Sequence, residues 1–202
     1  MIVIIDYGSG NLRSVQNGFA RAGYNTVISG NPRDLEAAGG LVLPGVGAFG
    51  QCMDSLRRSG LDRVLVAQAE KGVPLLGICV GMQLMFEHGT ELGEHRGLGL
   101  LAGSVVRFDG GLKVPHVGWN RVECLRRHPL FEGIADGTYF YFVHSYYACP
   151  RDRRAVLAVA SYGAVFPAVV HRDNIFGIQF HPEKSGRPGL QVLRNYGRLV
   201  EC

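Results

Sequence analysis

The chain has 202 residues, enough for one domain with a sizeable core, and 47% of them are hydrophobic, an ordinary globular composition. The formal net charge is only +4 and no run of Lys or Arg occurs, so the sequence does not favour nucleic-acid binding. No apolar stretch approaches the ~18 residues needed to cross a bilayer, and Asp6 ends the first apolar run, so we expect a cytoplasmic protein without membrane association.

The first half of the chain alternates segments typical of buried strands with segments typical of helices. Residues 2–5 form a continuous apolar run, which predicts a strand buried on both faces. A helix is expected between Asn11, a suitable N-cap, and Gly23, a suitable helix end. Further strands are predicted at 26–28, 41–43 and 74–78, and further helices at 52–58, 61–71 and 80–87. This alternation predicts an α/β fold with a mostly parallel sheet wrapped by helices.

The second half consists of short, closely spaced strand-like segments. They are predicted at 105–108, 121–125, 139–143, 156–160, 168–171 and 175–179, followed by an amphipathic helix at 190–200. Such spacing favours antiparallel strands added to the sheet. Because no linker or internal repeat occurs, we expect residues 1–202 to form a single domain.

The cysteines do not form a pattern typical of a zinc site or a disulfide framework. They are odd in number, far apart, and include no C-x-x-C pair. The five are Cys52, Cys79, Cys124, Cys149 and Cys202. We expect Cys79 to be reactive and each of the others to be dispensable for chemistry.

The segment Gly77-Ile78-Cys79-Val80-Gly81 has the features of a nucleophile elbow. A predicted strand runs into Cys79 and a predicted helix runs out of it, as in the G-x-S-x-G turn. Glycines on both sides would let strand and helix approach without Cβ clashes. The helix N-terminus would favour a thiolate. The alternative for a cysteine in isolation is a buried structural residue.

A candidate base follows the strand predicted at 175–179, in Phe180-His181-Pro182-Glu183-Lys184-Ser185. In an extended chain His181 and Glu183 point to one side, so the carboxylate can orient the imidazole. A thiol nucleophile needs such a base, and the leaving ammonia needs a proton. An isolated H-x-E sequence is most often exposed at the surface without a catalytic role, but together with the elbow it completes a Cys-His-Glu triad.

These motifs resemble the class I (triad) glutamine amidotransferases. Within that family the chain is most similar to the glutaminase subunits of imidazole glycerol phosphate synthase, from histidine biosynthesis. The similarity rests on motifs that span nearly the whole chain: Ile5-Asp6-Tyr7-Gly8, Gly10-Asn11, Pro44-Gly45-Val46-Gly47, Cys79-Val80-Gly81-Met82-Gln83, Pro115-His116-Val117-Gly118-Trp119-Asn120, His144-Ser145-Tyr146-Tyr147 and Gly177-Ile178-Gln179-Phe180-His181-Pro182-Glu183-Lys184-Ser185. The resemblance implies a Rossmann-like, three-layer fold.

The resemblance also assigns substrate contacts. Gln83 lies one helical turn after Cys79, where it can reach substrate at the sulfur. Glu91 resembles the residue that meets the α-amino group of glutamine, while Ser145 and Tyr146 resemble the segment that holds its α-carboxylate. The alternatives are an exposed helix residue for Gln83 and strand-end packing for Ser145 and Tyr146.

An acyl-transfer site also needs N–H donors for the developing oxyanion. Elbow geometry makes the Val80 amide one donor. The resemblance assigns the Val46 amide as the second and places Gly47 beside the substrate. Gly45 and Gly47 would permit the peptide to reorient, so we expect a switch here that Gly45→Val would restrict. The alternative is a plain strand-to-helix turn.

The implied reaction is hydrolysis of glutamine, with ammonia delivered to a cyclase subunit, a (β/α)₈ barrel, in a heterodimer. Trp119, in a glycine-flanked turn, and Lys184 are expected at that interface, although both could be merely packed or solvated. No metal or organic cofactor is expected. The alternatives are a glutaminase serving another synthase, a cysteine hydrolase that is not an amidotransferase, and a non-enzymatic regulatory subunit.

Overall fold

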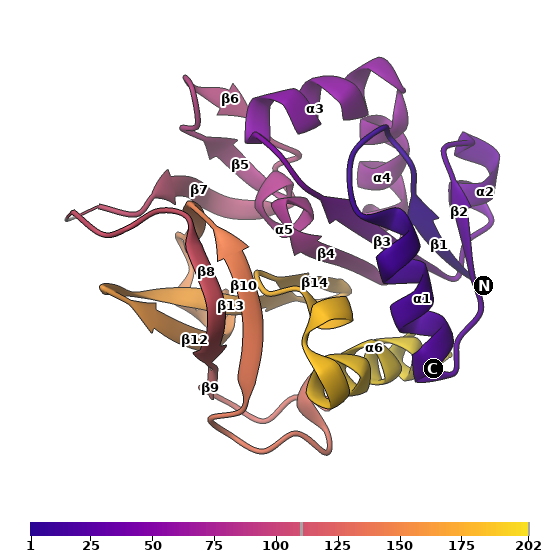
Figure 1. Cartoon of the computed structure of the whole chain (residues 1–202). Coiled ribbons are helices and arrows are strands. Elements are labelled where there is room, and N and C mark those ends of the chain that lie inside the picture. Colours follow the sequence, from indigo (N-terminus) through magenta and orange to yellow (C-terminus); the bar gives the residue numbers. More distant parts are fainter. Residues whose placement is uncertain (110, 202) are drawn as a thin grey trace.

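The computed structural model describes residues 1–109 and 111–201 (Figure 1). An eight-stranded sheet runs through the protein in the order β2-β1-β3-β4-β14-β13-β12-β9. The first five strands are parallel: β2 (Thr26–Ser29), β1 (Ile2–Ile5), β3 (Gly40–Gly45), β4 (Leu75–Cys79) and β14 (Ile175–Ile178). The other three are antiparallel: β13 (Ala164–Arg172), β12 (Val156–Tyr162) and β9 (Glu123–Cys124). The α/β fold and its mostly parallel sheet with antiparallel additions are therefore confirmed.

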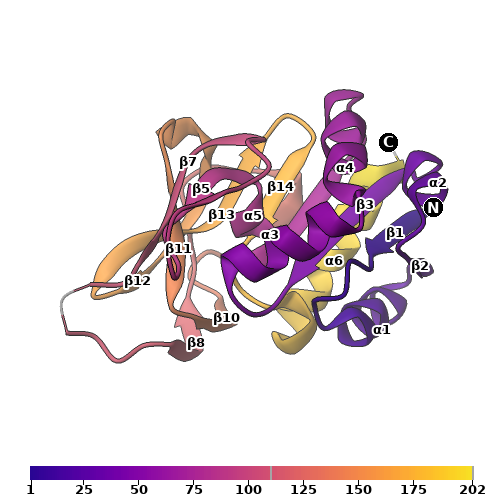
Figure 2. The same ribbon diagram turned by 90° about the horizontal axis from the view of Figure 1, so that it is seen from above.

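Helices cover both faces of the parallel part of this sheet (Figures 1 and 2). Helices α1 (Leu12–Ala22) and α6 (Gly186–Glu201) pack against each other on one side. Helices α2 (Pro32–Glu36), α3 (Phe49–Arg58) and α4 (Leu61–Glu70) pack together on the other. The short helix α5 (Val80–Leu84) follows β4 directly. None of the helices in the described part of the chain is long and apolar enough to span a membrane.

Two smaller sheets flank the main one. A four-stranded sheet has the order β11-β7-β5-β6, with bounds Tyr146–Pro150, Leu101–Arg107, Phe86–Gly89 and His95–Arg96. A two-stranded ribbon pairs β8 (His116–Arg121) with β10 (Tyr139–His144). Three 3-10 turns complete the chain: η1 (Pro129–Phe131), η2 (Arg153–Ala155) and η3 (Pro182–Lys184). The ribbon lies beside η3, and so close to the predicted base.

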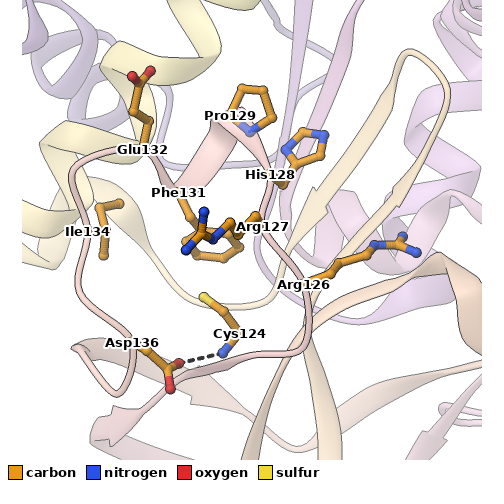
Figure 3. A pocket seen from close by; sticks show the side chains of 9 residues that line it. All are labelled: Cys124, Arg126, Arg127, His128, Pro129, Phe131, Glu132, Ile134 and Asp136. Carbon is orange, nitrogen blue, oxygen red and sulfur yellow. Dashed lines mark hydrogen bonds between the residues drawn. The ribbon is translucent and has the colours of Figure 1, made fainter.

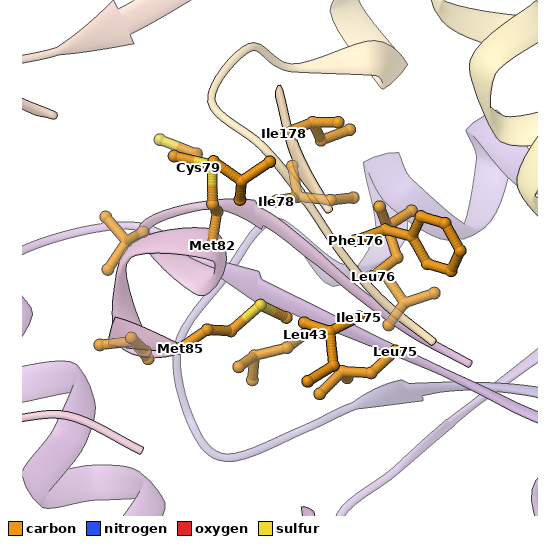
Figure 4. Close-up of a cluster of buried hydrophobic side chains, with 14 of the residues drawn as sticks. Leu43, Leu75, Leu76, Ile78, Cys79, Met82, Met85, Ile175, Phe176 and Ile178 are labelled. Carbon is orange, nitrogen blue, oxygen red and sulfur yellow. The ribbon is translucent and has the colours of Figure 1, made fainter. Parts of the chain in front are cut away.

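The central strands are buried on both faces, as their continuous apolar runs predict. Aliphatic side chains of β3, β4 and β14 meet Met82 of α5 and Met85, which follows the helix (Figure 4). The members of this cluster include Leu43, Leu75, Leu76, Ile78, Met82, Met85, Ile175 and Ile178, all buried. The dense packing fixes the ends of these strands, and this is where the candidate site lies.

Two local predictions are wrong. The helix predicted at 80–87 ends at Leu84, and Phe86–Gly89 forms β5. A Cβ at Gly89 would lie 2.8 Å from the Phe49 ring, so this segment is fitted to a tertiary contact. Trp119 lies in strand β8 instead of a turn. The short elements α2, β6 and β11 were not predicted at all.

Candidate active site

The candidate site lies beyond the carboxyl ends of three adjacent parallel strands. The β3–β4 register pairs Gly45 with Cys79, and the β4–β14 register pairs Ile78 with Ile178. The predicted oxyanion loop and the segment leading to His181 therefore flank the predicted nucleophile. Ligand sites of open α/β sheets are found at this edge.

Cys79 adopts the strained turn that the elbow requires. Its φ is 55° and its ψ is −114°, a backbone conformation that residues other than glycine rarely adopt. A Cβ at Gly81 would lie 1.8 Å from the Leu43 carbonyl oxygen, and one at Gly77 would lie 2.7 Å from the Met82 nitrogen. This confirms that both flanking glycines are needed for strand and helix to approach.

His181 and Glu183 form a buried pair beside this elbow. His181 Nδ1 lies 2.9 Å from Glu183 Oε1, and the two side chains are 4% and 1% exposed. The chain here is not extended as predicted, because Glu183 lies in the 3-10 turn η3. Gly18 of α1 makes room for it, since a Cβ there would lie 3.3 Å from the Glu183 Cβ. Within residues 1–109 and 111–201, no hydrogen-bond partner reaches His181 Nε2 or Glu183 Oε2.

The electrostatic environment makes His181 a good proton acceptor. Burial lowers the pKa of His181, but the Cys79 and Glu183 side chains outweigh burial and raise the pKa to about 9. The imidazole therefore binds a proton more tightly than an ordinary histidine does. Transfer of the thiol proton to Nε2 is correspondingly easy.

Two further groups contact the Cys79 sulfur, and neither was predicted. The thiol points toward the Val143 carbonyl oxygen at 3.9 Å, and Gln179 Nε2 lies 3.7 Å from Sγ. A signal for Gln179 exists in the sequence, because it is a polar residue between the apolar Ile178 and Phe180. Nothing in the sequence marks Val143, whose contribution is a backbone oxygen.

A pocket of about 320 Å³ opens at the sulfur. It is lined by ten of the predicted site residues, namely Val46, Gly47, Cys79, Val80, Gln83, Glu91, Ser145, Tyr146, His181 and Lys184, and also by Pro115, Val143 and His144. Of the other two predicted residues, Glu183 lies behind His181, and Trp119 lies on the ribbon. The structure thus gathers side chains from six separate segments around one cavity.

Hydrogen bonds fix two polar side chains at the pocket wall. Gln83 is buried and donates through Nε2 to the Tyr146 carbonyl oxygen at 2.9 Å. Glu91 Oε2 accepts a hydrogen bond from the Phe49 N–H, at the start of α3, at 2.8 Å. This bond holds the Glu91 carboxylate at the pocket.

The segment Pro44–Gly47 is tied to the N-terminal turn of the chain. The Tyr7 hydroxyl donates to the Pro44 carbonyl oxygen at 2.9 Å. The Val46 carbonyl oxygen accepts from the Ser9 hydroxyl at 2.8 Å and from the Cys52 thiol at 3.3 Å. Gly47 has a φ of 103°, a region that suits glycine. A Cβ at Gly45 would lie 2.6 Å from the Gly81 nitrogen, so Gly45→Val would distort the elbow itself and cannot test a switch.

A second buried pair consists of two histidines, His116 and His144, of which His144 lines the pocket. His116 Nδ1 lies 3.1 Å from His144 Nε2, and His144 Nδ1 lies 2.9 Å from the Tyr146 carbonyl oxygen. Since a carbonyl only accepts, His144 Nδ1 must carry a proton and Nε2 must accept one from His116. Burial lowers the pKa of both rings, that of His144 to about 3. This pair is therefore neutral and has a structural role.

A larger cavity, of about 790 Å³, lies elsewhere and is no candidate for this chemistry (Figure 3). It contains Cys124 and His128, but no triad. Burial and then Asp136 raise the pKa of the Cys124 thiol, while burial, His171 and Arg126 lower that of His128 to about 4. A thiol that keeps its proton, in a cavity whose imidazole binds a proton poorly, is not an activated nucleophile.

No metal site is found in the part of the chain that the structure describes. No group of three or more His, Cys, Asp or Glu side chains there is placed to hold an ion. Cys52, Cys79, Cys124 and Cys149 are free thiols. Cys202 lies outside the described residues.

Comparison with known proteins gives consistent matches over the whole chain. The family model for class I glutamine amidotransferases matches residues 3–198. The chain is 50% identical over 206 residues to the imidazole glycerol phosphate synthase subunit HisH of Syntrophotalea carbinolica, covering 98% of this chain and 100% of that relative. It is 52% identical over 199 residues to the same subunit of Moorella thermoacetica, covering 98% and 95%.

Solved structures show the same fold at low sequence identity. A glutamine amidotransferase crystal structure superposes with a TM-score of 0.79 at 22% identity, covering all of both chains. A chain of the structure of PurLQS from Thermotoga maritima gives a TM-score of 0.79 at 18% identity, covering 98% of each chain.

Proposed function

The chain belongs to the class I glutamine amidotransferase family, and on that basis we propose that it hydrolyses glutamine with Cys79 as the nucleophile. Like the relatives that it matches from end to end, it is the glutaminase subunit of imidazole glycerol phosphate synthase. The observation that supports Cys79 is the meeting of three groups at one pocket: the elbow sulfur, the raised pKa of His181 and the buried Glu183.

The first half of the reaction releases ammonia. The Cys79 thiol proton passes to His181 Nε2, and the sulfur forms a bond to the side-chain amide carbon of glutamine. The amide oxygen takes up the negative charge, which the Val80 and Val46 N–H groups stabilise. The carbon–nitrogen bond then breaks as His181 returns its proton to the leaving nitrogen. The products are ammonia and a glutamyl thioester on Cys79.

The second half restores the enzyme. His181 removes a proton from water, and the hydroxide oxygen bonds to the thioester carbon. The carbon–sulfur bond breaks, glutamate leaves, and the proton returns from His181 to the sulfur. Glu183 takes no proton in either half of the reaction. Its role is to keep the His181 imidazole oriented and to stabilise the charged form of that ring.

Substrate is held by the remaining wall of the pocket. Glu91 is the acceptor for the α-amino group, and the Ser145–Tyr146 backbone faces the α-carboxylate. Gln83 and Gly47 line the space between them. Together these positions place an amino acid with its side-chain amide at the sulfur. No metal or organic cofactor enters this mechanism.

The partner is proposed to be a cyclase with a (β/α)₈ barrel, which uses the ammonia in a cytoplasmic heterodimer. The outer face of the ribbon presents three exposed apolar side chains, Val117, Trp119 and Tyr139, each 56% exposed, with Arg121 at its end. Trp119 packs edge-on against Tyr141, and Lys184 Nζ lies 5.8 Å from the Tyr141 ring centroid. Lys184 also lines the Cys79 pocket, so this face adjoins the site of ammonia release. We propose that it docks on the cyclase, and that residues 1–202 act as one domain.

The alternatives have less support. A glutaminase for another synthase does not fit the imidazole glycerol phosphate synthase relatives at 50% and 52% identity. A cysteine hydrolase of another kind does not fit the family match over residues 3–198. A non-enzymatic subunit does not fit the buried triad, because an unused carboxylate would be costly to keep buried.

The direct test is to purify the chain with the cyclase and measure glutamate formation with and without the cyclase's ribonucleotide. We expect a stable complex whose glutaminase activity rises by orders of magnitude when the ribonucleotide is present. A matched control is Val165, an exposed apolar residue of β13. Trp119→Ala should weaken the complex, whereas Val165→Ala should not. Equal effects of the two substitutions would exclude the ribbon as the docking face.

A further inference from the structure

Gln179 is a fully buried polar residue that the triad mechanism leaves without a role. It follows the last residue of β14 and has no exposed surface. Its side chain makes two polar contacts: Nε2 lies 3.7 Å from Cys79 Sγ, and Oε1 lies 3.0 Å from Gln83 Nε2. Buried amides normally form hydrogen bonds with their neighbours. Whether the Gln179 amide can also donate a hydrogen bond to the Cys79 sulfur depends on which way its NH₂ group points.

The orientation of the Gln179 amide is set by the Tyr146 carbonyl oxygen, which acts on it through Gln83. The Tyr146 carbonyl can only accept, so Gln83 must turn its NH₂ group toward it. The second N–H of that same group then faces Gln179, which must present Oε1. The NH₂ group of Gln179 is thereby directed at the sulfur. An inverted amide at either position would bring two acceptors, or two donors, face to face.

The acceptor that sets this order is itself fixed. His144 Nδ1 donates to the same Tyr146 oxygen at 2.9 Å, and His144 is in turn held by His116. Since a carbonyl oxygen has two lone pairs, it accommodates both donors. The arrangement is thus built into the fold before any substrate is bound.

We propose that Gln179 is a further catalytic residue that donates a hydrogen bond to the Cys79 thiolate. The proposal rests on Cys79 being the nucleophile, as proposed above. When the thiol proton leaves for His181, the sulfur becomes a largely buried anion, since Cys79 is only 3% exposed. A donor already aimed at it stabilises that anion without any reorganisation. Hydrogen bonds to ions are about twice as strong as those between neutral groups, so the contact gains strength when the thiolate forms.

The purely structural alternative makes a different prediction. If Gln179 served only to satisfy Gln83, replacing it would alter stability but not the ease with which Cys79 loses its proton. The pH dependence of thiol alkylation separates the two, because only the thiolate reacts with iodoacetamide. This measurement needs no partner subunit and no turnover.

Two substitutions remove the donor in different ways. Gln179→Met keeps the length of the side chain and removes both polar atoms. Gln179→Glu keeps the acceptor for Gln83 and replaces the donor by a carboxylate oxygen. Gln68→Met is the matched control, since Gln68 is also a buried glutamine, 2% exposed, but lies on α4 and does not line the pocket.

The alkylation rate of Cys79 would be followed between pH 5 and 10 by mass spectrometry of its peptide, with Cys149 as an internal reference. We expect the half-maximal pH to rise by about one unit in Gln179→Met and further in Gln179→Glu, as for the loss of one hydrogen bond to an ion. Gln68→Met and the Cys149 profile should match the wild type. An unshifted Cys79 profile in either folded Gln179 variant would overturn the proposal.

Unfolding of one variant does not remove the test, because the other then provides it, and Gln83→Met provides a third. Gln83→Met releases the Gln179 amide from its fixed orientation, and we expect a smaller shift in the same direction. Failure of the proposed function looks different: Cys79→Ser would retain glutaminase activity, while the Cys79 alkylation profile would still be shifted in the Gln179 variants.

Discussion

Two buried histidines line the same pocket and have opposite protonation behaviour. His181 and His144 are 3% and 6% exposed, so burial acts on both and disfavours the charged ring. Yet the pKa of His181 is raised to about 9, while that of His144 is lowered to about 3.

The difference lies in what each ring touches. His181 contacts the carboxylate of Glu183 and lies against the Cys79 thiol, both of which favour a charged imidazole. The hydrogen bond of His144 to the Tyr146 oxygen raises the pKa of this ring by less than burial lowers it, and His116 lowers the pKa further. A position near the nucleophile is therefore not enough to make a histidine basic. Direct partners, here Cys79 and the charged Glu183, are what raise the pKa of the ring. His144 supports the Tyr146 segment of the wall, and we propose that His181 moves protons.

The largest expected effect comes from making His181 resemble His144. Glu183→Gln keeps an oxygen that accepts from Nδ1 but removes the negative charge, so the pKa of His181 should fall. We expect the kcat for glutamine hydrolysis in the complex to drop roughly 10³–10⁴-fold. Glu132→Gln, at an exposed surface carboxylate, is the control and should have no effect. A loss below tenfold for Glu183→Gln would mean that His181 does not depend on its carboxylate.

A second prediction concerns the proposed oxyanion loop, Pro44–Gly47, which contributes backbone N–H groups and no titratable side chain. If the Val46 amide turns inward only when the loaded partner docks, the free subunit lacks one donor and is slower by about 10²–10³-fold. Gly47→Ala should restrict this movement, because Gly47 lies at a φ of 103°. A Cβ there has open space around it, so its effect acts through the backbone alone.

The readout is the ratio of turnover in the loaded complex to that of the free subunit. We expect Gly47→Ala to lower this ratio while glutamine binding changes little. Gly23→Ala is the matched control, since Gly23 has a φ of 97° and open space but ends α1, away from the pocket. A parallel fall in ratio and binding would make the loop merely structural.

The smallest expected effect is on stability. The folded-state pKa of His144 lies below the unfolded value of about 6.5, so its contribution is complete above pH 6.5 and decreases as the pH falls toward 3. His181 has the opposite sign: its contribution is complete below pH 6.5 and is lost as the pH rises through about 9. Between pH 7 and 4.5 we expect these two rings together to lower the free energy of unfolding by about 2 kcal/mol.

Denaturant unfolding measured on the acid side of neutrality and up through about pH 9 would show both contributions. His144→Gln should make the acid side of the profile flatter, and His181→Gln the alkaline side. If neither variant differed in slope from the wild type, the two rings would titrate alike in the folded and unfolded states, and the contrast between them would be wrong.

The sequence was sufficient for those parts of the fold that are set by local pattern. The apolar runs at β1 and β4 and the period of α1 carry their own signals. Gly23 ends α1 in the left-handed conformation, as expected, but the Asn11 side chain makes no capping hydrogen bond. The end of α5 carries no such signal, because Phe86–Gly89 becomes a strand by pairing with β7 and with β6. The pairing with β7 joins residues that are 15 or 16 positions apart, which local propensity does not register.

The site divides in the same way. Cys79, His181 and Glu183 could be predicted because each lies in a short motif whose chemistry is specific. Gln179 could not be assigned a role, since its orientation is set by Tyr146 through Gln83. That relation spans three separate segments and exists only in the folded chain.

Glutamate formation by Cys79→Ser in the ribonucleotide-loaded complex tests the mechanism most directly. Cys149→Ser is the appropriate control, because Cys52 contacts the Val46 oxygen and Cys149 does not line the pocket. We expect Cys79→Ser to fold, to bind the partner and to form no glutamate, while Cys149→Ser retains wild-type activity. Glutamate formation at the wild-type rate by folded Cys79→Ser would contradict a cysteine mechanism at this elbow.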